Sequence, residues 1–321
     1  MEMEKILKRV QEDSVGTEDI TLNCNEYYMD STNKIHILGT NLSYDLTDWA
    51  FSQACNSLGM PARYEKKLAG RMPAMVQQQF NYWKNELNKD VLLRTKDNNI
   101  RGFLSTGYAP YNNENLVEQL HSMGNSYGDP IACCLNDHIF HLRFVDSSEE
   151  YDAGQTVHQV GDILQKGVDV LNSEVGACSV VVTPMVYRLV CTNGLRTWSR
   201  DEDFTGETKF RHYKKSEADF QALVEKSMEE ALKKNGKMAE RFITAKNFAL
   251  DADPNKIIED LLKKDKATQK TIQRAKEEFL LEPEMNMYGI INSITAAAKG
   301  FEKIEDRVHL ESYAGKVLAS L

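Results

Sequence analysis

The apolar positions along the chain change their period, and each change predicts a different kind of element. Apolar residues recur at helical spacing over residues 1–13 and in the segments 46–58, 61–68 and 73–87. Gly59 and the prolines that open the last two segments are typical of helix ends and first turns. The first hundred residues are therefore predicted to be largely helical. Extended segments are expected at 33–46, 91–95 and 100–106.

The middle of the chain alternates with a period of two, which predicts strands. Residues 130–146 divide at Asn136-Asp137 into the two arms of a hairpin, and two further extended runs cover 160–176 and 177–192. Pro184 lies inside the last run, so that strand is predicted to be bulged there or to lie on an edge. Asn193-Gly194 is predicted to end the run in a turn, because both residues tolerate positive φ.

A long helix is predicted from Ser216, because Ser216 and Asp219 resemble a capping box and an apolar stripe follows to about Lys234. The stripe resumes at Met238, and three more helices are expected after Asp253. The fold class is therefore α+β. We expect a helical N-terminal region with short strands at 1–125, an antiparallel sheet of about four strands with a long helix at 126–250, and C-terminal helices at 251–321. The three regions can also form one continuous domain.

Composition makes this a globular chain with an uneven charge. The 321 residues are 41% hydrophobic and 27% charged, with a net charge of −9. Residues 1–50 carry ten acids against four bases, whereas residues 188–215 carry seven bases against four acids. Six cysteines form no disulfide framework, and no signal peptide or membrane span is visible. We therefore expect a cytosolic protein with no membrane partner.

The basic segment contains aromatic residues among its cations, a pattern that fits single-stranded nucleic acid. Cations follow the phosphate backbone of a single strand, and flat rings stack on its unpaired bases. A second basic and aromatic set lies earlier in the chain, around residues 94–111. The alternative interpretation is a solvated face with Trp198 in the core. The predicted nucleic-acid-binding residues are Arg188, Arg196, Trp198, Arg200, Lys209, Arg211, Lys214 and Lys215, together with Arg101 and Tyr108.

The familiar catalytic motifs are absent from the sequence, so we expect no cofactor and no catalytic residue. The richest metal-like group places its members on opposite faces of a hairpin, which disfavours zinc. That group is Cys133, Cys134, His138 and His141.

Two enzymatic alternatives stay open. Cys191 beside His212 has the residue types of a nucleophile and its base, but a packed cysteine at a strand end is the favoured explanation of Cys191. Consecutive carboxylates at 201–203 suggest a Mg²⁺-dependent nuclease that uses Asp201, Asp203 and Glu207.

Several stretches, in order over roughly residues 35–315, resemble a family encoded by phages, prophages and plasmids and catalogued as a domain of unknown function. They are "QACNSLGMPARYEKKL", "LLRTKDNNIRGFLSTGYAPYNNENLVEQL", "NSEVGACSVVVTPMVYRLVCTNGL" and "INSITAAAK". "RxFLSxxY" and "RLVCTNG" are the most distinctive pieces. Asn292-Ser293 stands where relatives often have Asn-Ala.

This resemblance implies a mobile-element protein in a bacterial cytosol and brings no assigned reaction. The predicted order of hairpin, sheet and long helix is also similar to that of phage single-strand annealing proteins, an analogy at the level of fold. We therefore expect a non-enzymatic, homo-oligomeric protein that binds single-stranded DNA and assists strand annealing or recombination. The alternatives are an interaction protein, which blocks a host defence system through an acidic N-terminal surface that binds a host or phage protein, and the nuclease.

Overall fold

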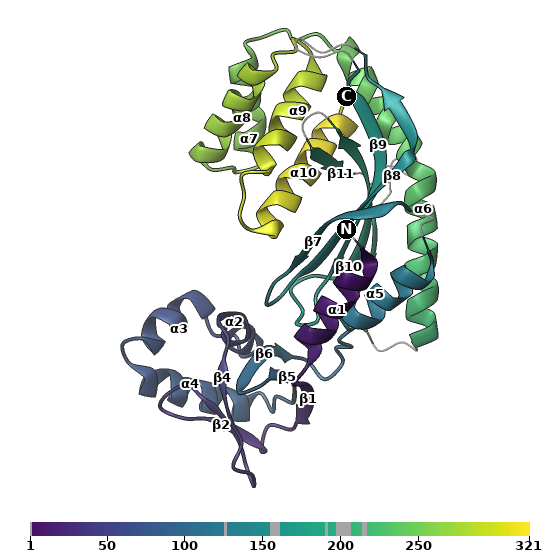
Figure 1. Cartoon of the computed structure of the whole chain (residues 1–321). Coiled ribbons are helices and arrows are strands. Elements are labelled where there is room, and N and C mark those ends of the chain that lie inside the picture. Colours follow the sequence, from purple (N-terminus) through teal and green to yellow (C-terminus); the bar gives the residue numbers. More distant parts are fainter. Residues whose placement is uncertain (1, 125–126, 155–160, 190–191, 197–206, 214–216) are drawn as a thin grey trace.

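The computed structural model describes residues 2–124, 127–154, 161–189, 192–196, 207–213 and 217–321. This part of the chain contains ten α-helices and two six-stranded sheets, so the α+β prediction is confirmed. Figure 1 shows an N-terminal lobe, a central sheet and a cap of C-terminal helices.

The N-terminal lobe, residues 17–104, has a sheet of its own with strand order β1-β5-β6-β4-β3-β2. The expected strands at 91–95 and 100–106 are β5 and β6, whereas β1 was not anticipated. Its sequence, TEDITL, is polar and buries only Leu22, so it lacks the alternation that marks a strand. The elements are β1 (Thr17–Leu22), β2 (Tyr27–Met29), β3 (Ile35–Ile37), β4 (Ser43–Leu46), α2 (Asp48–Ser57), α3 (Ala62–Ala69), α4 (Pro73–Glu86), β5 (Val91–Lys96) and β6 (Asn99–Leu104).

The central sheet is an antiparallel meander whose two faces differ in chemistry. One face is apolar, with side chains such as Phe144, Val168 and Val182, and it is covered by α1, α5 and the long α6. Helix α6 is continuous across Lys234, where the apolar stripe seemed to pause. The elements are α1 (Met3–Ser14), α5 (Asn113–Ser122), β7 (Asp129–Leu135), β8 (Phe140–Asp152), β9 (Ile163–Asn172), β10 (Val180–Arg188), β11 (Asn193–Arg196), β12 (Thr208–Phe210) and α6 (Glu217–Thr244).

The second face of the central sheet is covered by C-terminal helices. Helix α10 packs on β11, and a small apolar cluster joins Leu171 and Val181 to Ile304 at the start of α10. Residue Asp253 caps α7 as expected, since its side chain accepts a hydrogen bond from the Asn255 amide. The elements are the 3₁₀ turn η1 (Ala245–Asn247), α7 (Pro254–Lys264), α8 (Gln269–Leu281), α9 (Met287–Ala298) and α10 (Ile304–Ala319).

The prediction of a turn at Asn193-Gly194 is wrong. Both residues belong to β11, where they pair with Arg188 and Tyr187 of β10. Glycine is needed at 194 for space, because a Cβ there would lie 2.9 Å from the Arg143 guanidinium. The glycine of this pair therefore marks a close approach of a side chain to the backbone inside the sheet instead of a turn.

Strand β10 lies inside the sheet, yet on one side Pro184 has no ladder partner in the part of the chain that the structure describes. Residues 180–182 pair with β12 and residues 185–188 pair with β11, so Pro184 falls in the gap between them. On its other side Pro184 lies opposite Val168 of β9. A residue without an N–H group is therefore tolerated here because β10 is locally an edge.

The loop after β9, residues 173–177, joins the N-terminal lobe to the central sheet. The Val175 carbonyl accepts hydrogen bonds from Trp49 and Gln53 of α2 at 2.9 and 2.7 Å. Gly176 has φ +77° and lies against Gln53 and Leu104, where a Cβ would come within 2.9 Å of the leucine. The path of this loop therefore depends on glycine.

We predict that Gly176→Ala destabilises the protein by about 2–4 kcal/mol, because it combines a left-handed backbone with overpacking. The matched control is Gly59→Ala. Gly59 has φ +70° with nothing within 4 Å of its Cβ position, so it isolates the backbone effect. Urea unfolding measures the free energy of unfolding of both variants. Equal losses of stability in the two variants would show that the loop around Gly176 tolerates a methyl group.

Candidate functional site

Arg196, predicted to contact phosphates, lies in a buried charge cluster on the second face of the central sheet. Its side chain is 2% exposed, and its Nε lies 3.1 Å from Asp169 of β9. Arg143 of β8 makes two hydrogen bonds to the same carboxylate at 2.7 and 2.8 Å. Glu311 of α10 accepts a hydrogen bond from Arg143 at 2.5 Å. Arg196 therefore holds the sheet together and is not available at the surface, which corrects the prediction.

Electrostatics keep Asp169 charged in spite of its burial. Burial disfavours the ionised carboxyl, but Arg143 and His141 outweigh it and hold the pKa of Asp169 well below its usual value. Burial in turn lowers the pKa of the neighbouring His141. The group is a buried ion cluster in which Arg143, His141 and Arg196 all lie against the Asp169 carboxylate.

Arg188 is also buried, at the end of β10. It contacts Asp162 at 2.7 Å and Glu282, at the end of α8, at 2.5 Å. Its guanidinium lies over the ring of Tyr288, and the Tyr288 hydroxyl donates to Asp162 at 2.5 Å. This side chain ties the sheet to the C-terminal helices, so the prediction that it contacts DNA is wrong.

Arg101 belongs to the joint between the lobes. It donates to the Asp137 carbonyl at the tip of the β7–β8 hairpin at 3.1 Å, and it lies 3.7 Å from the Asp13 carboxylate. Lys96 contacts the same carboxylate at 2.7 Å. Part of the acidic N-terminal segment is thus neutralised internally, and Arg101 is nearly buried instead of facing a ligand.

Exposed cations and a ring do come together on one segment, which we call the 207–213 edge. Lys209, Arg211 and Tyr213 alternate along it and are exposed, with Tyr213 58% exposed. Lys209 pairs with Glu207, and Arg211 lies 3.3 Å from the Tyr213 hydroxyl. Exposed ion pairs of this kind are weak, so the pairing leaves Lys209 able to bind another anion.

The 207–213 edge is held by His212, which is buried between two rings. Tyr108 stacks on it at 4.8 Å, Tyr111 lies 5.2 Å away, and His212 Nδ1 is 3.0 Å from the Ala109 carbonyl. Burial lowers the pKa of His212, which favours an uncharged ring. The two basic and aromatic sets of the sequence therefore meet here, although the Tyr108 hydroxyl is engaged by the Ser173 carbonyl at 2.7 Å. Tyr111, at the end of the second set, adds its ring to this contact.

Several predicted residues lie outside the described part of the chain. They are Trp198, Arg200, Lys214 and Lys215 of the nucleic-acid set, Cys191 of the proposed nucleophile pair, and Asp201, Glu202 and Asp203 of the nuclease alternative.

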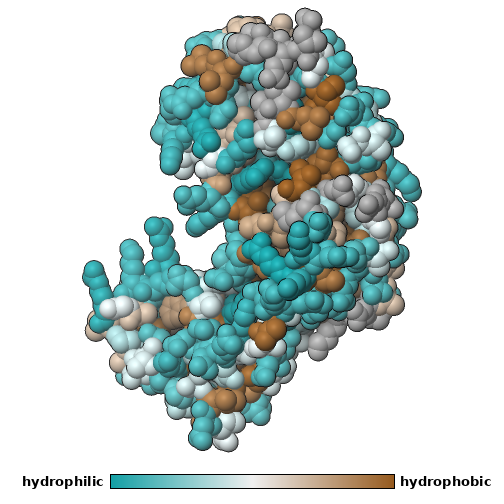
Figure 2. Space-filling model, viewed as in Figure 1, coloured by the Kyte–Doolittle hydropathy of each residue, from teal (hydrophilic) through white to brown (hydrophobic). Residues whose placement is uncertain are grey.

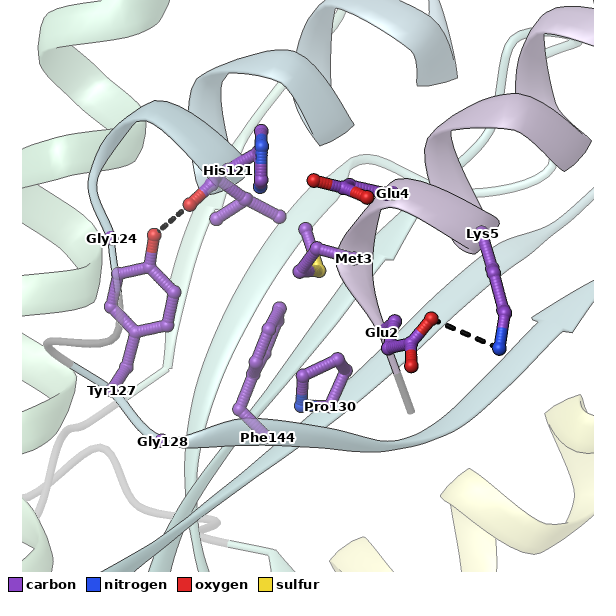
Figure 3. A pocket seen from close by; sticks show the side chains of 11 residues that line it. Glu2, Met3, Glu4, Lys5, His121, Gly124, Tyr127, Gly128, Pro130 and Phe144 are labelled. Carbon is purple, nitrogen blue, oxygen red and sulfur yellow. Dashed lines mark hydrogen bonds and ion pairs between the residues drawn. The ribbon is translucent and has the colours of Figure 1, made fainter.

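The described residues bring no set of metal ligands together. Within them, no group of three or more histidine, cysteine, aspartate or glutamate side chains could hold a metal ion. A cavity of about 630 Å³ opens beside the start of α1 and is lined by Met3, Tyr127 and Phe144 (Figure 3). Glu2 and Lys5 pair with each other at 2.9 Å instead of converging on its interior. Glu4 of α1 and His121 of α5 also line the cavity.

We predict that Arg188→Gln lowers the free energy of unfolding by about 3–5 kcal/mol, because Asp162 and Glu282 would remain without their shared cation. Arg211→Gln removes the same charge from the exposed edge and should change stability by less than about 0.5 kcal/mol. Urea unfolding, followed by circular dichroism, measures the free energy of unfolding of both variants. Similar stabilities for both variants would contradict the internal role of Arg188.

Comparison with known proteins places the chain in a family without naming an activity. A family model described as Domain of unknown function (DUF932) matches residues 102–298, from within β6 to the end of α9. No curated protein and no solved structure matches the chain. Among the described helices, none has the length and apolar composition needed to cross a membrane. Because the match covers more than half of the 321 residues, the chain belongs to the DUF932 family.

Proposed function

We propose that this protein binds single-stranded DNA without cleaving it and assists strand annealing or recombination in the bacterial cytosol during replication of a mobile element. The observation that carries the proposal is the 207–213 edge, where two cations and an exposed ring alternate along one segment. Cations attract the backbone of a single strand, and an exposed ring stacks on unpaired bases.

The construction of the edge supports this function. His212 is buried, so its neighbours Arg211 and Tyr213 both face solvent and cannot turn inward together. The Tyr213 carbonyl accepts a hydrogen bond from Tyr111 at 2.6 Å, which fixes the backbone beneath the ring. A ring held on a fixed backbone loses less conformational entropy when a base stacks on it.

Within the described residues, the proposed DNA contact is smaller than the one predicted from the sequence. Arg188, Arg196 and Arg101 are committed to internal ion pairs, and the contact therefore rests on Lys209, Arg211 and Tyr213. The element order also fits, since an antiparallel meander precedes the long helix α6. Annealing needs no bond chemistry, and it does need neighbouring protomers that present strands to each other, so homo-oligomers are part of the proposal.

We predict that Tyr213→Leu weakens binding of a fluorescein-labelled oligothymidine by about 1–3 kcal/mol, through the loss of base stacking. Arg211→Gln should lower the log–log salt slope of the affinity by about 0.7, the value for one phosphate contact on a single strand. Fluorescence anisotropy at several salt concentrations measures both. Lys233→Gln, on the exposed side of α6, is the control and should leave the affinity unchanged. Unchanged affinity for the two edge variants would contradict the proposed site.

The annealing activity itself is tested with complementary labelled oligonucleotides. We expect the wild-type protein to accelerate their annealing and Tyr213→Leu to reduce the acceleration in proportion to its loss of affinity. Native mass spectrometry of the same sample should show oligomers. Cleavage of the oligonucleotides after addition of Mg²⁺ would contradict the non-enzymatic proposal and favour a nuclease.

A further inference from the structure

Helix α3 and the turn that follows it expose three cations that no carboxylate of the described residues neutralises. Arg63 and Lys67 are four residues apart on α3, and Arg71 follows in the turn before α4. All three are exposed, and none of their side chains has an ion-pair or hydrogen-bond partner among the described residues. The fourth cation, Lys66, lies 3.6 Å from Asp48. We call Arg63, Tyr64, Lys67 and Arg71 the α3 surface.

The absence of nearby acids explains why these cations stay unpaired. Between Trp49 and Asn85 the only carboxylate in the sequence is Glu65. Glu65 is buried, its Oε2 has no hydrogen-bond partner among the described residues, and burial raises its pKa. On a chain of net charge −9, the α3 surface is therefore a local positive field.

Exposed rings lie in the same pair of helices. Tyr64 is 58% exposed and stands on α3 between Arg63 and Lys67. On α4, Tyr82 and Trp83 are exposed and touch edge to face, with ring centroids 5.1 Å apart. Rings beside unpaired cations offer both contacts that a single strand needs, stacking for bases and charge for phosphates.

The α3 surface borders a hollow in the molecule. Helix α3 lies on the side of the N-terminal lobe that faces the C-terminal helices (Figure 1). Figure 2 shows long hydrophilic side chains rising from this region where the molecule is hollowed between the two parts. A flexible strand can follow such a concave surface, whereas a flat bilayer cannot reach into it.

We propose that the α3 surface is a second binding surface for single-stranded nucleic acid, in which Arg63, Lys67 and Arg71 contact phosphates and Tyr64 stacks on a base. This inference rests on the proposed function and extends its contacts to a helix that lies outside residues 102–298, the part that matches the family model. Duplex DNA fits less well, because its bases are already stacked and leave no face for Tyr64.

The test is a triple variant, Arg63→Gln, Lys67→Gln and Arg71→Gln, in the full-length protein. Three phosphate contacts on a single strand correspond to a salt slope of about 2, so we expect a loss of about 100-fold in affinity for oligothymidine at 0.1 M salt. The matched control removes three exposed lysines from α6, by Lys226→Gln, Lys233→Gln and Lys237→Gln. It changes the net charge equally and should retain wild-type affinity.

Two further measurements identify the ligand and the contact. Ultraviolet crosslinking of the same oligonucleotide, followed by peptide mapping, should label the peptide that contains Tyr64. Binding to vesicles of phosphatidylglycerol and phosphatidylcholine should be the same for the wild-type protein and the triple variant.

The outcomes separate this inference from the proposed function. Wild-type affinity in the triple variant, together with a loss in Tyr213→Leu, overturns the α3 surface and leaves the function standing. A wild-type protein that fails to bind the oligonucleotide overturns both. Vesicle binding that only the triple variant loses, with oligonucleotide affinity intact, overturns the inference in favour of a membrane surface.

Discussion

The carboxylate of Asp169, buried among cations, is the constraint on which the central part of the structure depends. A charge removed from water is tolerated only when partners replace its hydration. Those partners come from separate elements: Arg143 from β8, Arg196 from β11, and, through Arg143, Glu311 from α10. The register of the strands and the position of α10 must therefore be correct together. A misplaced strand would leave a buried charge without the partners that offset its desolvation.

The stretches singled out in the sequence are used largely for internal contacts. Tyr108 of "RxFLSxxY" donates to Ser173 of "NSEVG". Asn193 of "RLVCTNG" donates to Thr295 of "INSITAAAK", and Arg188 of the former binds Asp162. These distinctive residues hold distant parts of the chain against one another. Surfaces that could meet a ligand, such as the 207–213 edge, lie beside them.

Sequence patterns predicted elements well and side-chain environments poorly. The alternation from Pro130 to Asp146 and the prolines at the start of α3 and α4 correctly indicated a hairpin and two helices. The pattern could not indicate that Arg188 and Arg196 would be buried, because the carboxylates that accept them, Asp162, Asp169 and Glu282, lie 26, 27 and 94 residues away along the chain. A basic residue in an alternating strand has the same local pattern whether it meets water or a distant acid. The unpaired cations of α3 were missed for a similar reason, since burial of Glu65 is a tertiary effect.

Helix α6 has a mechanical consequence for the whole molecule. Its 28 residues extend for about 42 Å. Its first half contributes Phe220 and Val224 to the core beneath α1 and α5, and its second half contributes Met238 and Phe242 to the core of the C-terminal helices. Neither core can unfold without exposing apolar side chains of the helix that both cores share. The central sheet and the C-terminal helices should therefore lose their structure in a single all-or-none transition.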